Sequence, residues 1–388
     1  MNEKQNNIID LINSVLNKKN ATIKVIKDFS YIFDIATRHH IMTMLYYAFY
    51  YNDIRIEADA EQLLQYAVFR ELSINEKQLH YINKLNEEFN KNNIDHMFLK
   101  GSVLKNLYPR TEIRRMGDID ILIKEKQYDK IAVIMKKEGF SFHNESNHEF
   151  VWLKENIRVE LHKILMPSYN KDLHAYFGNG WKRSVKTVEN CYAFSNDDMF
   201  IYIFSHFAKH YRDAGIGIMH MCDLYVFLKS YSPNLAYISA ELKKLHLYDF
   251  YRNIRKTLDV WFNGSQGDEV TDYITAVIFD SGVYGLKEKS ILSTALKSEK
   301  QYKKLSLGKL QRIFKRVFPG YNGMKTKYQT LKKLPVLLPA FWIWRWVMIL
   351  ITKHHDIKKE LHNICAVSQD EVGEYQKSLK YVGLDYYF

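Results

Sequence analysis

The sequence predicts an α+β protein in which a small mixed-sheet domain is flanked by an N-terminal and a C-terminal helical region. Apolar residues recur at three- and four-residue steps before residue 90 and again after residue 190, as in amphipathic helices. Between these regions the apolar runs are short or alternate with polar residues, as in strands. Six Pro and 16 Gly among 388 residues favour long helices over a turn-rich all-β fold. We therefore expect three regions, at 1–90, 91–190 and 191–388.

The N-terminal region carries helical periodicity in IIDLINSVL and in FSYIFDIATRHHIMTMLYYAFYY. Its first residues contain no apolar run of the length that a signal peptide needs. The three cysteines, Cys191, Cys222 and Cys365, form no CxxC pair, which favours a reducing cytoplasm over a disulfide framework. The pair His39-His40 has no evident partner in the sequence and is expected at the surface.

Strands and short helices alternate in the central region. Each predicted strand is short and apolar or shows period-two alternation: IDHMFLK (94–100), GDIDILI (117–123), HEFVWLK (148–154) and NIRVELHKIL (156–165). The last two are expected to pair, with Glu155-Asn156 near the turn, and GDIDILI to be half-buried. SVLKNLY predicts a short helix closed by Pro109, and residues 126–139 predict an amphipathic helix capped by Gly139.

The C-terminal region predicts separate helices over 199–211, 222–231 and 238–262, followed by a break at 263–269. Its charge is concentrated in one segment. Residues 281–333 contain 14 Lys and Arg against two acidic residues. The net charge of this segment is therefore +12, which equals the formal net charge of the whole chain. Such a segment attracts a polyanion or an anionic membrane surface, or else forms a solvated helical face.

Residues 335–352 (PVLLPAFWIWRWVMILIT) are the most apolar stretch of the chain. Their length approaches that of a membrane span, but Pro339 and Arg345 interrupt them. We expect an aromatic helix buried in the C-terminal domain. The alternatives are an interfacial membrane helix, which the three tryptophans of this stretch would suit, and a true span.

Acidic residues on the predicted strands form the candidate site. Asp118 and Asp120 lie two apart, so their side chains leave the same face, and paired carboxylates are ligands that Mg²⁺ prefers. A DxD motif alone is weak, but here a strand runs into Gly101-Ser102 at the start of a helix, where a phosphate is bound readily. Glu160 and His162 also share one strand face. This combination is typical of phosphoryl transfer assisted by metal ions.

The stretch LKGSVLKNLYPRTEIRRMGDIDILI resembles the uncharacterised bacterial nucleotidyltransferases of the DNA-polymerase-beta-like superfamily. The similarity continues through VELHKIL and SHFAKHYRDAGIGIMHMCDLYVFL to the aromatic segment near 335–346. Met219 departs from the family, whose members commonly carry an arginine there. The resemblance implies a nucleotidyltransferase domain that uses Mg²⁺ or Mn²⁺ and an NTP.

Site residues carried over from the resemblance fall into three groups. The metal ligands and catalytic acids would be Asp118, Asp120 and Glu160. The nucleotide phosphates would be contacted by Gly101, Ser102, Lys100 and Arg114. The substrate cleft would include His162, His206, His210 and Asp223. An independent metal site at the helical histidines is the alternative for His206 and His210, although the sequence has no HExxH motif.

These residues predict an enzyme that moves an NMP from an NTP to an acceptor hydroxyl and releases pyrophosphate. The acceptor, a small molecule, a protein or an RNA, is not readable from the sequence, nor is the base of the nucleotide. Two other functions stay open. One is a nucleotide-binding regulatory protein without turnover. The other is a nucleic-acid- or membrane-associated module that depends on residues 281–352.

Overall fold

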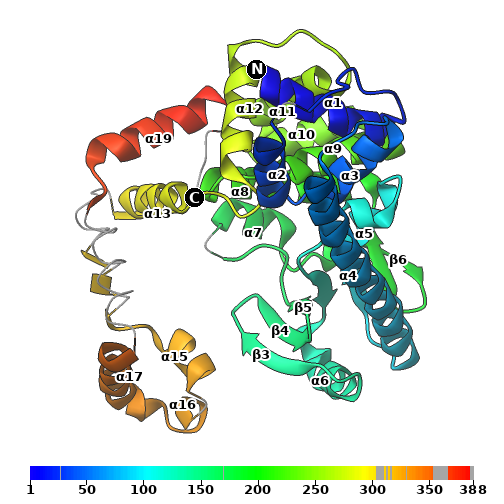
Figure 1. Ribbon diagram of the computed structural model, residues 1–388. Coiled ribbons are helices and arrows are strands. Elements are labelled where there is room, and N and C mark those ends of the chain that lie inside the picture. The colour runs from blue at the N-terminus through cyan, green and yellow to red at the C-terminus, as the bar shows by residue number, and fades with distance from the viewer. Residues whose placement is uncertain are drawn as a thin grey trace.

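The computed structural model describes residues 1–26, 28–168, 170–302, 310–311, 313–314, 317–328, 330–352 and 366–384 (Figure 1). The N-terminal region forms helices, as predicted: α1 (Glu3–Asn17), α2 (Phe29–His39), α3 (Met42–Tyr51) and α4 (Ala58–Lys91). Local chemistry sets where they begin. The Asn2 side chain accepts a hydrogen bond from the backbone N–H of Gln5, and the Gln5 side chain accepts one from the backbone N–H of Asn2. Asp28 caps α2 by accepting from the backbone N–H of Tyr31.

One mixed sheet of seven strands forms the centre of the described chain, in the order β3-β4-β5-β2-β1-β7-β6. The strands are β1 (His96–Phe98), β2 (Ile119–Ile123), β3 (Ser141–Glu145), β4 (Glu149–Lys154), β5 (Ile157–His162), β6 (Ser184–Val188) and β7 (Cys191–Phe194). Strand β2 is antiparallel to β1 and parallel to β5. The β4–β5 hairpin turns at Glu155, which has a positive φ, so the predicted strand pair is confirmed.

Short helices connect the strands. They are α5 (Gly101–Leu104), η1 (Lys105–Leu107), η2 (Thr111–Ile113), η3 (Glu125–Gln127), α6 (Tyr128–Lys137), α7 (Lys171–Phe177) and η4 (Trp181–Arg183). Gly139 follows α6 with a φ of 81°, a conformation that glycine adopts without steric cost, which confirms the predicted helix end.

Helices resume after β7 and continue through the C-terminal region. They are α8 (Asn196–Asp213), α9 (Ile218–Tyr231), α10 (Leu235–Lys244), α11 (Tyr248–Phe262), α12 (Glu269–Ser281), α13 (Lys287–Tyr302), α15 (Tyr321–Lys327), α16 (Thr330–Lys333), η5 (Pro335–Leu337), α17 (Leu338–Thr352) and α19 (Gln369–Tyr381). In Figure 1, α15, α16 and α17 lie together at the lower left, apart from the helices that pack around α8. Part of the basic segment 281–333 lies outside the described residues.

Two hydrophobic cores cover the two faces of the sheet. The larger one joins the N-terminal helices, the C-terminal helices around α8, and sheet residues such as Met97 and Leu122. The smaller one joins Ile121 and its neighbours on β2 to Phe89 of α4 and Ile131 of α6. The α+β architecture is confirmed, and the boundaries at 90/91 and 190/191 stay a prediction.

Some sequence-based expectations were wrong. Strand β2 is not half-buried: all five residues are buried, because it lies mid-sheet with a core on each face. Residues 238–262 do not form one helix, since the chain breaks between α10 and α11, where His246 has a φ of 55°. Strands β3, β6 and β7 were not predicted. Exposed residues on β3 and β6 conceal the apolar pattern on which the prediction relied.

The aromatic helix α17 is not buried in the C-terminal domain. Ile343 is 69% exposed and Trp344 is 54% exposed. The helix packs on one side against residues 317–328, whereas its other side faces solvent. Among the described helices, none combines the length and the apolar character that a membrane span requires.

Candidate active site

A pocket of about 350 Å³ opens where the sheet meets helices α8 and α9. One wall comes from the sheet and the chain before α5 and β2, and it carries the predicted acids Asp118, Asp120 and Glu160. The opposite wall comes from the helices and carries His206, His210 and other basic residues. The pocket therefore places carboxylates and proton donors on facing surfaces.

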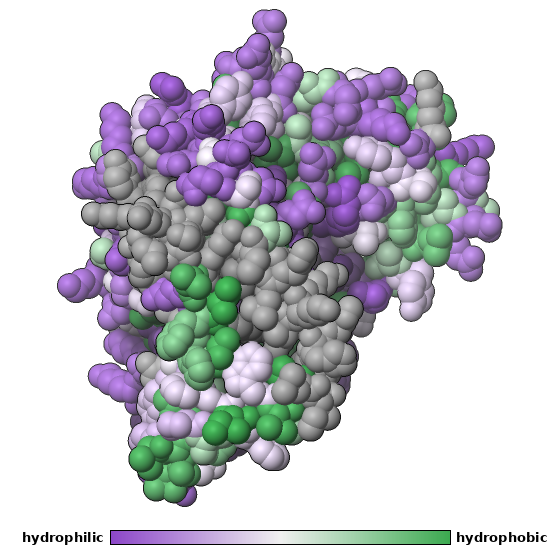
Figure 2. All heavy atoms as spheres, turned by 90° about the vertical axis from the view of Figure 1, so that its left-hand side faces the viewer, coloured by the Kyte–Doolittle hydropathy of each residue, from purple (hydrophilic) through white to green (hydrophobic). Residues whose placement is uncertain are grey.

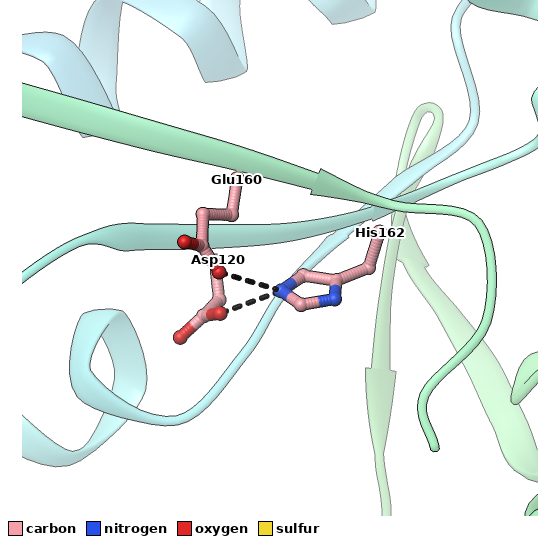
Figure 3. A group of neighbouring side chains, drawn as sticks. All are labelled: Asp120, Glu160 and His162. Carbon is pink, nitrogen blue, oxygen red and sulfur yellow. Dashed lines mark hydrogen bonds and ion pairs between the residues drawn. The ribbon is translucent and has the colours of Figure 1, made fainter. Parts of the chain in front are cut away.

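Strand register brings the acids of the sheet wall together. Strands β2 and β5 are parallel, with Asp120 directly opposite Glu160 and Leu122 opposite His162. Side chains two residues apart on one strand share a face, so Glu160 and His162 both lie beside Asp120. One ligand atom from each of the three side chains lies within 4.8 Å of the others (Figure 3).

Asp120 is almost completely buried, and two basic side chains contact one of its carboxylate oxygens. Lys100 Nζ donates to Oδ1 at 3.0 Å, and His162 Nε2 lies 2.6 Å from the same atom. Burial by itself would raise the pKa of Asp120, but Lys100 and His162 together lower it below its usual range. Asp120 is therefore held as a carboxylate.

The pKa of Asp118 is shifted in the opposite direction to that of Asp120. Burial, followed by repulsion from Asp120, raises the pKa of Asp118 to about 7, and Lys100 offsets only part of this. Two neighbouring carboxylates repel each other, and proton uptake by one of them relieves the repulsion. Such a pair is chemically suited to a divalent cation, which would remove the same repulsion.

Glu160 and His162 have further partners along the same strand face. Arg158 Nε donates to Glu160 Oε1 at 2.7 Å, while Glu160 Oε2 lies 3.7 Å from His162 Nε2. The other ring nitrogen of His162 lies 3.8 Å from Glu149 Oε2. Glu149 of β4 is thus a fourth acid at the site. It was missed because the sequence predicted the β4–β5 pair but not the register that sets Glu149 opposite His162.

The chain before α5 holds Lys100 in an unusual conformation. Its φ is 43° and its ψ is −114°, which is rare for a residue with a side chain and is tolerated where surrounding contacts fix it. At Gly101 a Cβ atom would lie 2.7 Å from Met116 Cγ and Arg114 Nη1, so any larger residue would displace these two side chains. Ser102 is buried with its hydroxyl 3.8 Å from Met116 Sδ, and it does not line the pocket.

Arg114 reaches the pocket but its guanidinium is engaged. It donates from Nη2 to Asp223 Oδ2 at 2.9 Å and from Nε to Oδ1 at 3.2 Å, and Tyr108 donates to the same Oδ1 at 2.8 Å. Asp223 lies on α9, so this buried network joins the loop before β2 to the helical wall. The structure thus brings Arg114 and Asp223 together, as partners of each other.

The helical wall carries two histidines and an unpaired lysine. His206 and His210, four residues apart on α8, bring their Nε2 atoms to 3.2 Å. Burial lowers the pKa of both histidines well below the ordinary value, so they are neutral. Lys209 lines the same pocket and has no ion-pair or hydrogen-bond partner among the described residues, whereas Lys100 and Arg114 each contact a carboxylate.

Most of the sequence that forms this pocket matches a known protein family. Residues 27–263, more than half of the chain and every strand of the sheet, match the family described as uncharacterised nucleotidyltransferase. The chain belongs to this nucleotidyltransferase family. No curated protein and no solved structure matches it. The family carries a general assignment of nucleotide transfer, and the bacterial origin and the wider superfamily stay predictions.

The residues of this nucleotidyltransferase fit a divalent cation. Asp120, Glu160 and His162 supply two carboxylates and an imidazole within reach of one ion, and Asp118 adds a further carboxylate that lines the same pocket. Carboxylate oxygens suit Mg²⁺ and Mn²⁺, and an imidazole ligand would favour Mn²⁺ over Mg²⁺. His162, expected only in the substrate cleft, is therefore a candidate ligand too.

Several pocket residues of the nucleotidyltransferase had no signal in the sequence. His40 lines the pocket and meets Tyr284 with ring centroids 5.3 Å apart, and His220 lines it from α9. The expectation that His39 lies at the surface was wrong, since it is fully buried between α9 and α12. These residues are far apart in the sequence, and only tertiary packing brings them to one place.

Proposed function

We propose that this nucleotidyltransferase moves an NMP from an NTP to an acceptor hydroxyl and releases pyrophosphate. The observation that carries the proposal is the convergence of Asp118, Asp120 and Glu160 on one pocket in a member of a nucleotidyltransferase family. In the reaction the acceptor oxygen forms a bond to the α-phosphorus. The bond from that phosphorus to the bridging oxygen breaks, and pyrophosphate leaves with the electron pair.

The three acids and His162 would hold Mg²⁺ or Mn²⁺, which would supply charge neutralisation for the triphosphate. Lys100 keeps Asp120 ionised and fixes its position through the 3.0 Å contact. Arg158 contacts only one oxygen of Glu160. The other oxygen would either hold the metal or accept the proton that the acceptor hydroxyl loses.

Phosphate recognition is proposed for Gly101, Lys100 and Arg114, as the resemblance implies, with Lys209 added. Ser102, which the resemblance also implies, is buried outside the pocket, so no direct contact of its hydroxyl with phosphate is proposed. Lys209 supports this role because it lines the pocket and no carboxylate of the described residues forms an ion pair with it. Arg114 would act chiefly by fixing the loop before β2, since Asp223 occupies its guanidinium. The neutral His206 and His210 would line the acceptor side, where an imidazole offers both a donor and an acceptor.

The decisive experiment incubates the purified chain and its Asp118→Asn variant with each labelled NTP and with Mg²⁺ or Mn²⁺ in a lysate of the native host. We expect metal-dependent transfer of label by the wild type and its loss in the variant. The labelled product would identify the nucleotide and the acceptor class. Folded wild-type chain that transfers no label from any NTP would favour a regulatory nucleotide-binding protein instead.

Metal binding gives a test that is independent of the acceptor. Adding Mn²⁺ is expected to raise the thermal unfolding temperature of the wild type, because a bound ion stabilises the folded state by mass action and removes carboxylate repulsion. Asp118→Asn combined with Glu160→Gln should abolish the rise. An equal rise in this double variant would show that the ion binds elsewhere.

We also propose that the nucleotidyltransferase works in a reducing cytoplasm, a setting that its scattered cysteines favour. An anionic partner, a polyanion or a membrane surface, is proposed for residues 281–352 because of their excess of Lys and Arg. Salt-sensitive binding of RNA or of anionic vesicles tests this second proposal.

A further inference from the structure

An apolar stripe runs along the outer side of α17. Exposed residues recur at three- and four-residue steps, so they share one helix face: Ala340, Ile343, Trp344, Val347 and Met348. The stripe continues into η5, where Val336 is 80% exposed. In Figure 2 hydrophobic side chains gather at the lower part of this face, at the height at which α15, α16 and α17 lie in Figure 1.

The inner side of α17 is fixed by specific contacts. Trp342 Nε1 donates to the Pro319 carbonyl at 2.9 Å, and Trp346 Nε1 donates to the Val317 carbonyl at 2.7 Å. The Phe341 ring meets Tyr328 with centroids 4.9 Å apart, and Arg345 is buried. Because these contacts set the rotation of the helix, the apolar stripe is presented outward by the fold.

Within residues 317–352 the sequence carries charge of a single sign. Residues 317–352 contain five basic residues and no acidic one. Lys333 is exposed directly before the stripe begins. An apolar face with an outward tryptophan and flanking lysines matches the headgroup region of a bilayer that contains anionic lipids, where indoles and lysines are both stabilised.

As described, α17 is shorter than a membrane span. Its 15 residues extend about 22 Å, less than the roughly 30 Å of a bilayer core. We propose that this nucleotidyltransferase docks on an anionic membrane through the outer face of η5 and α17, with the helix lying in the interface. Docking is independent of catalysis, because the stripe contributes no residue to the pocket.

The test measures co-sedimentation of the full chain with vesicles of phosphatidylcholine alone or mixed with phosphatidylglycerol, without nucleotide. We expect binding to the mixed vesicles that weakens as salt is added. Ile343→Ser with Trp344→Ser should weaken it by at least about tenfold, since apolar area no longer enters the interface. Lys325→Gln with Lys333→Gln should weaken it by about fivefold for each charge removed.

Phe69→Ser is the matched control, because Phe69 on α4 is 68% exposed and far from the stripe in sequence. It should bind as the wild type does. Circular dichroism and NTP consumption in solution should be unchanged in all these variants. As a second measurement on the wild type, brominated lipids should quench tryptophan fluorescence in the mixed vesicles.

Three outcomes would overturn the proposal. The first is the absence of vesicle binding and quenching by folded, active wild-type chain. The second is binding that survives Ile343→Ser with Trp344→Ser. The third is self-association, seen by sedimentation, that these substitutions abolish while vesicle binding is absent. Tight binding to single-stranded RNA that the serine variants retain, without vesicle binding, would assign the basic charge to nucleic acid instead.

Discussion

Asp118 and Asp120 lie two residues apart, yet their surroundings shift their pKa values in opposite directions. Lys100 and His162 both contact Asp120, whereas burial and the charge of Asp120 raise the pKa of Asp118 to about 7. One carboxylate is therefore paired within the protein, and the other carries the repulsion that a cation would relieve. The two positions of the motif therefore differ in their electrostatic surroundings.

Substituting each of these acids should separate activity from stability. Both Asp118→Asn and Asp120→Asn are expected to lower NTP turnover by roughly 10²–10³-fold, because each removes a carboxylate from the proposed metal site. Only Asp120→Asn should also destabilise the fold, by about 1–3 kcal/mol, since Lys100 loses its buried counter-charge. Urea unfolding and NTP consumption measure the two effects. Equal destabilisation by both variants would contradict the assignment.

Lys209 lines the helical wall of the pocket, and no described carboxylate forms an ion pair with its ammonium group. Lys209→Gln should raise KM for the NTP about tenfold, the effect of losing about 1.4 kcal/mol of binding. Lys209→Arg should keep most of the affinity. Burial, and next the charge of Lys100, lowers the pKa of Lys209 to about 8. KM of the wild type should therefore rise as the pH increases through about 8, and a KM unchanged by Lys209→Gln would refute this role.

At the scale of elements, two contacts build the pocket. The parallel register of β2 and β5 sets Asp120 against Glu160, and the Arg114–Asp223 pair joins the loop before β2 to α9. The first contact positions the acids. The second fixes the distance between the sheet wall and the helical wall, since both partners are buried.

Removing the buried Arg114–Asp223 ion pair should lower the free energy of unfolding more than substitutions at the surface do. Asp223→Ala is expected to destabilise the fold by about 3–5 kcal/mol, because Arg114 is left buried and unpaired. Tyr108→Phe should cost about 1–3 kcal/mol, since it removes one hydrogen bond to a charged group. Asp249→Asn, on the exposed surface of α11, is the control and should stay within about 0.5 kcal/mol. Thermal and urea unfolding measure all three.

At the scale of the whole molecule, buried neutral histidines tie the helical regions together. His39 of α2 accepts a hydrogen bond at Nδ1 from the Ile218 amide and donates from Nε2 to the Phe279 carbonyl. Burial lowers the pKa of His39 to about 4, and the pKa values of His40 and His220 fall to about 4 for the same reason. Folding is therefore linked to the loss of several protons.

This linkage predicts acid sensitivity. The folded pKa of His39 lies below the ordinary 6.5, so its contribution is complete above about pH 6.5 and is lost as the pH falls toward 4. The change amounts to roughly 3 kcal/mol for this residue. We expect the free energy of unfolding to fall over this range in the wild type and to fall less steeply in His39→Gln. Parallel pH profiles of the two proteins would contradict the prediction.

Much of the fold and the chemical character of the site were predictable from local pattern. Helical spacing gave the helices before residue 90 and after residue 195, and period-two alternation gave β2, β4 and β5. The predicted acids Asp118, Asp120 and Glu160 do line one pocket. These features depend on residues a few positions apart, whose burial periodicity is written directly in the sequence.

By itself, then, the sequence determined the α+β class and the acids that a nucleotidyltransferase would use. Only the tertiary structure decided that Asp120 faces Glu160 and His162 and that Asp223 pairs with Arg114, whereas no described carboxylate pairs with Lys209. It also decided that α17 turns an apolar face outward. Each of these contacts or exposures depends on residues distant in the chain. Their partners are selected by the packing of both cores and by the pairing of buried charges, which no local pattern encodes.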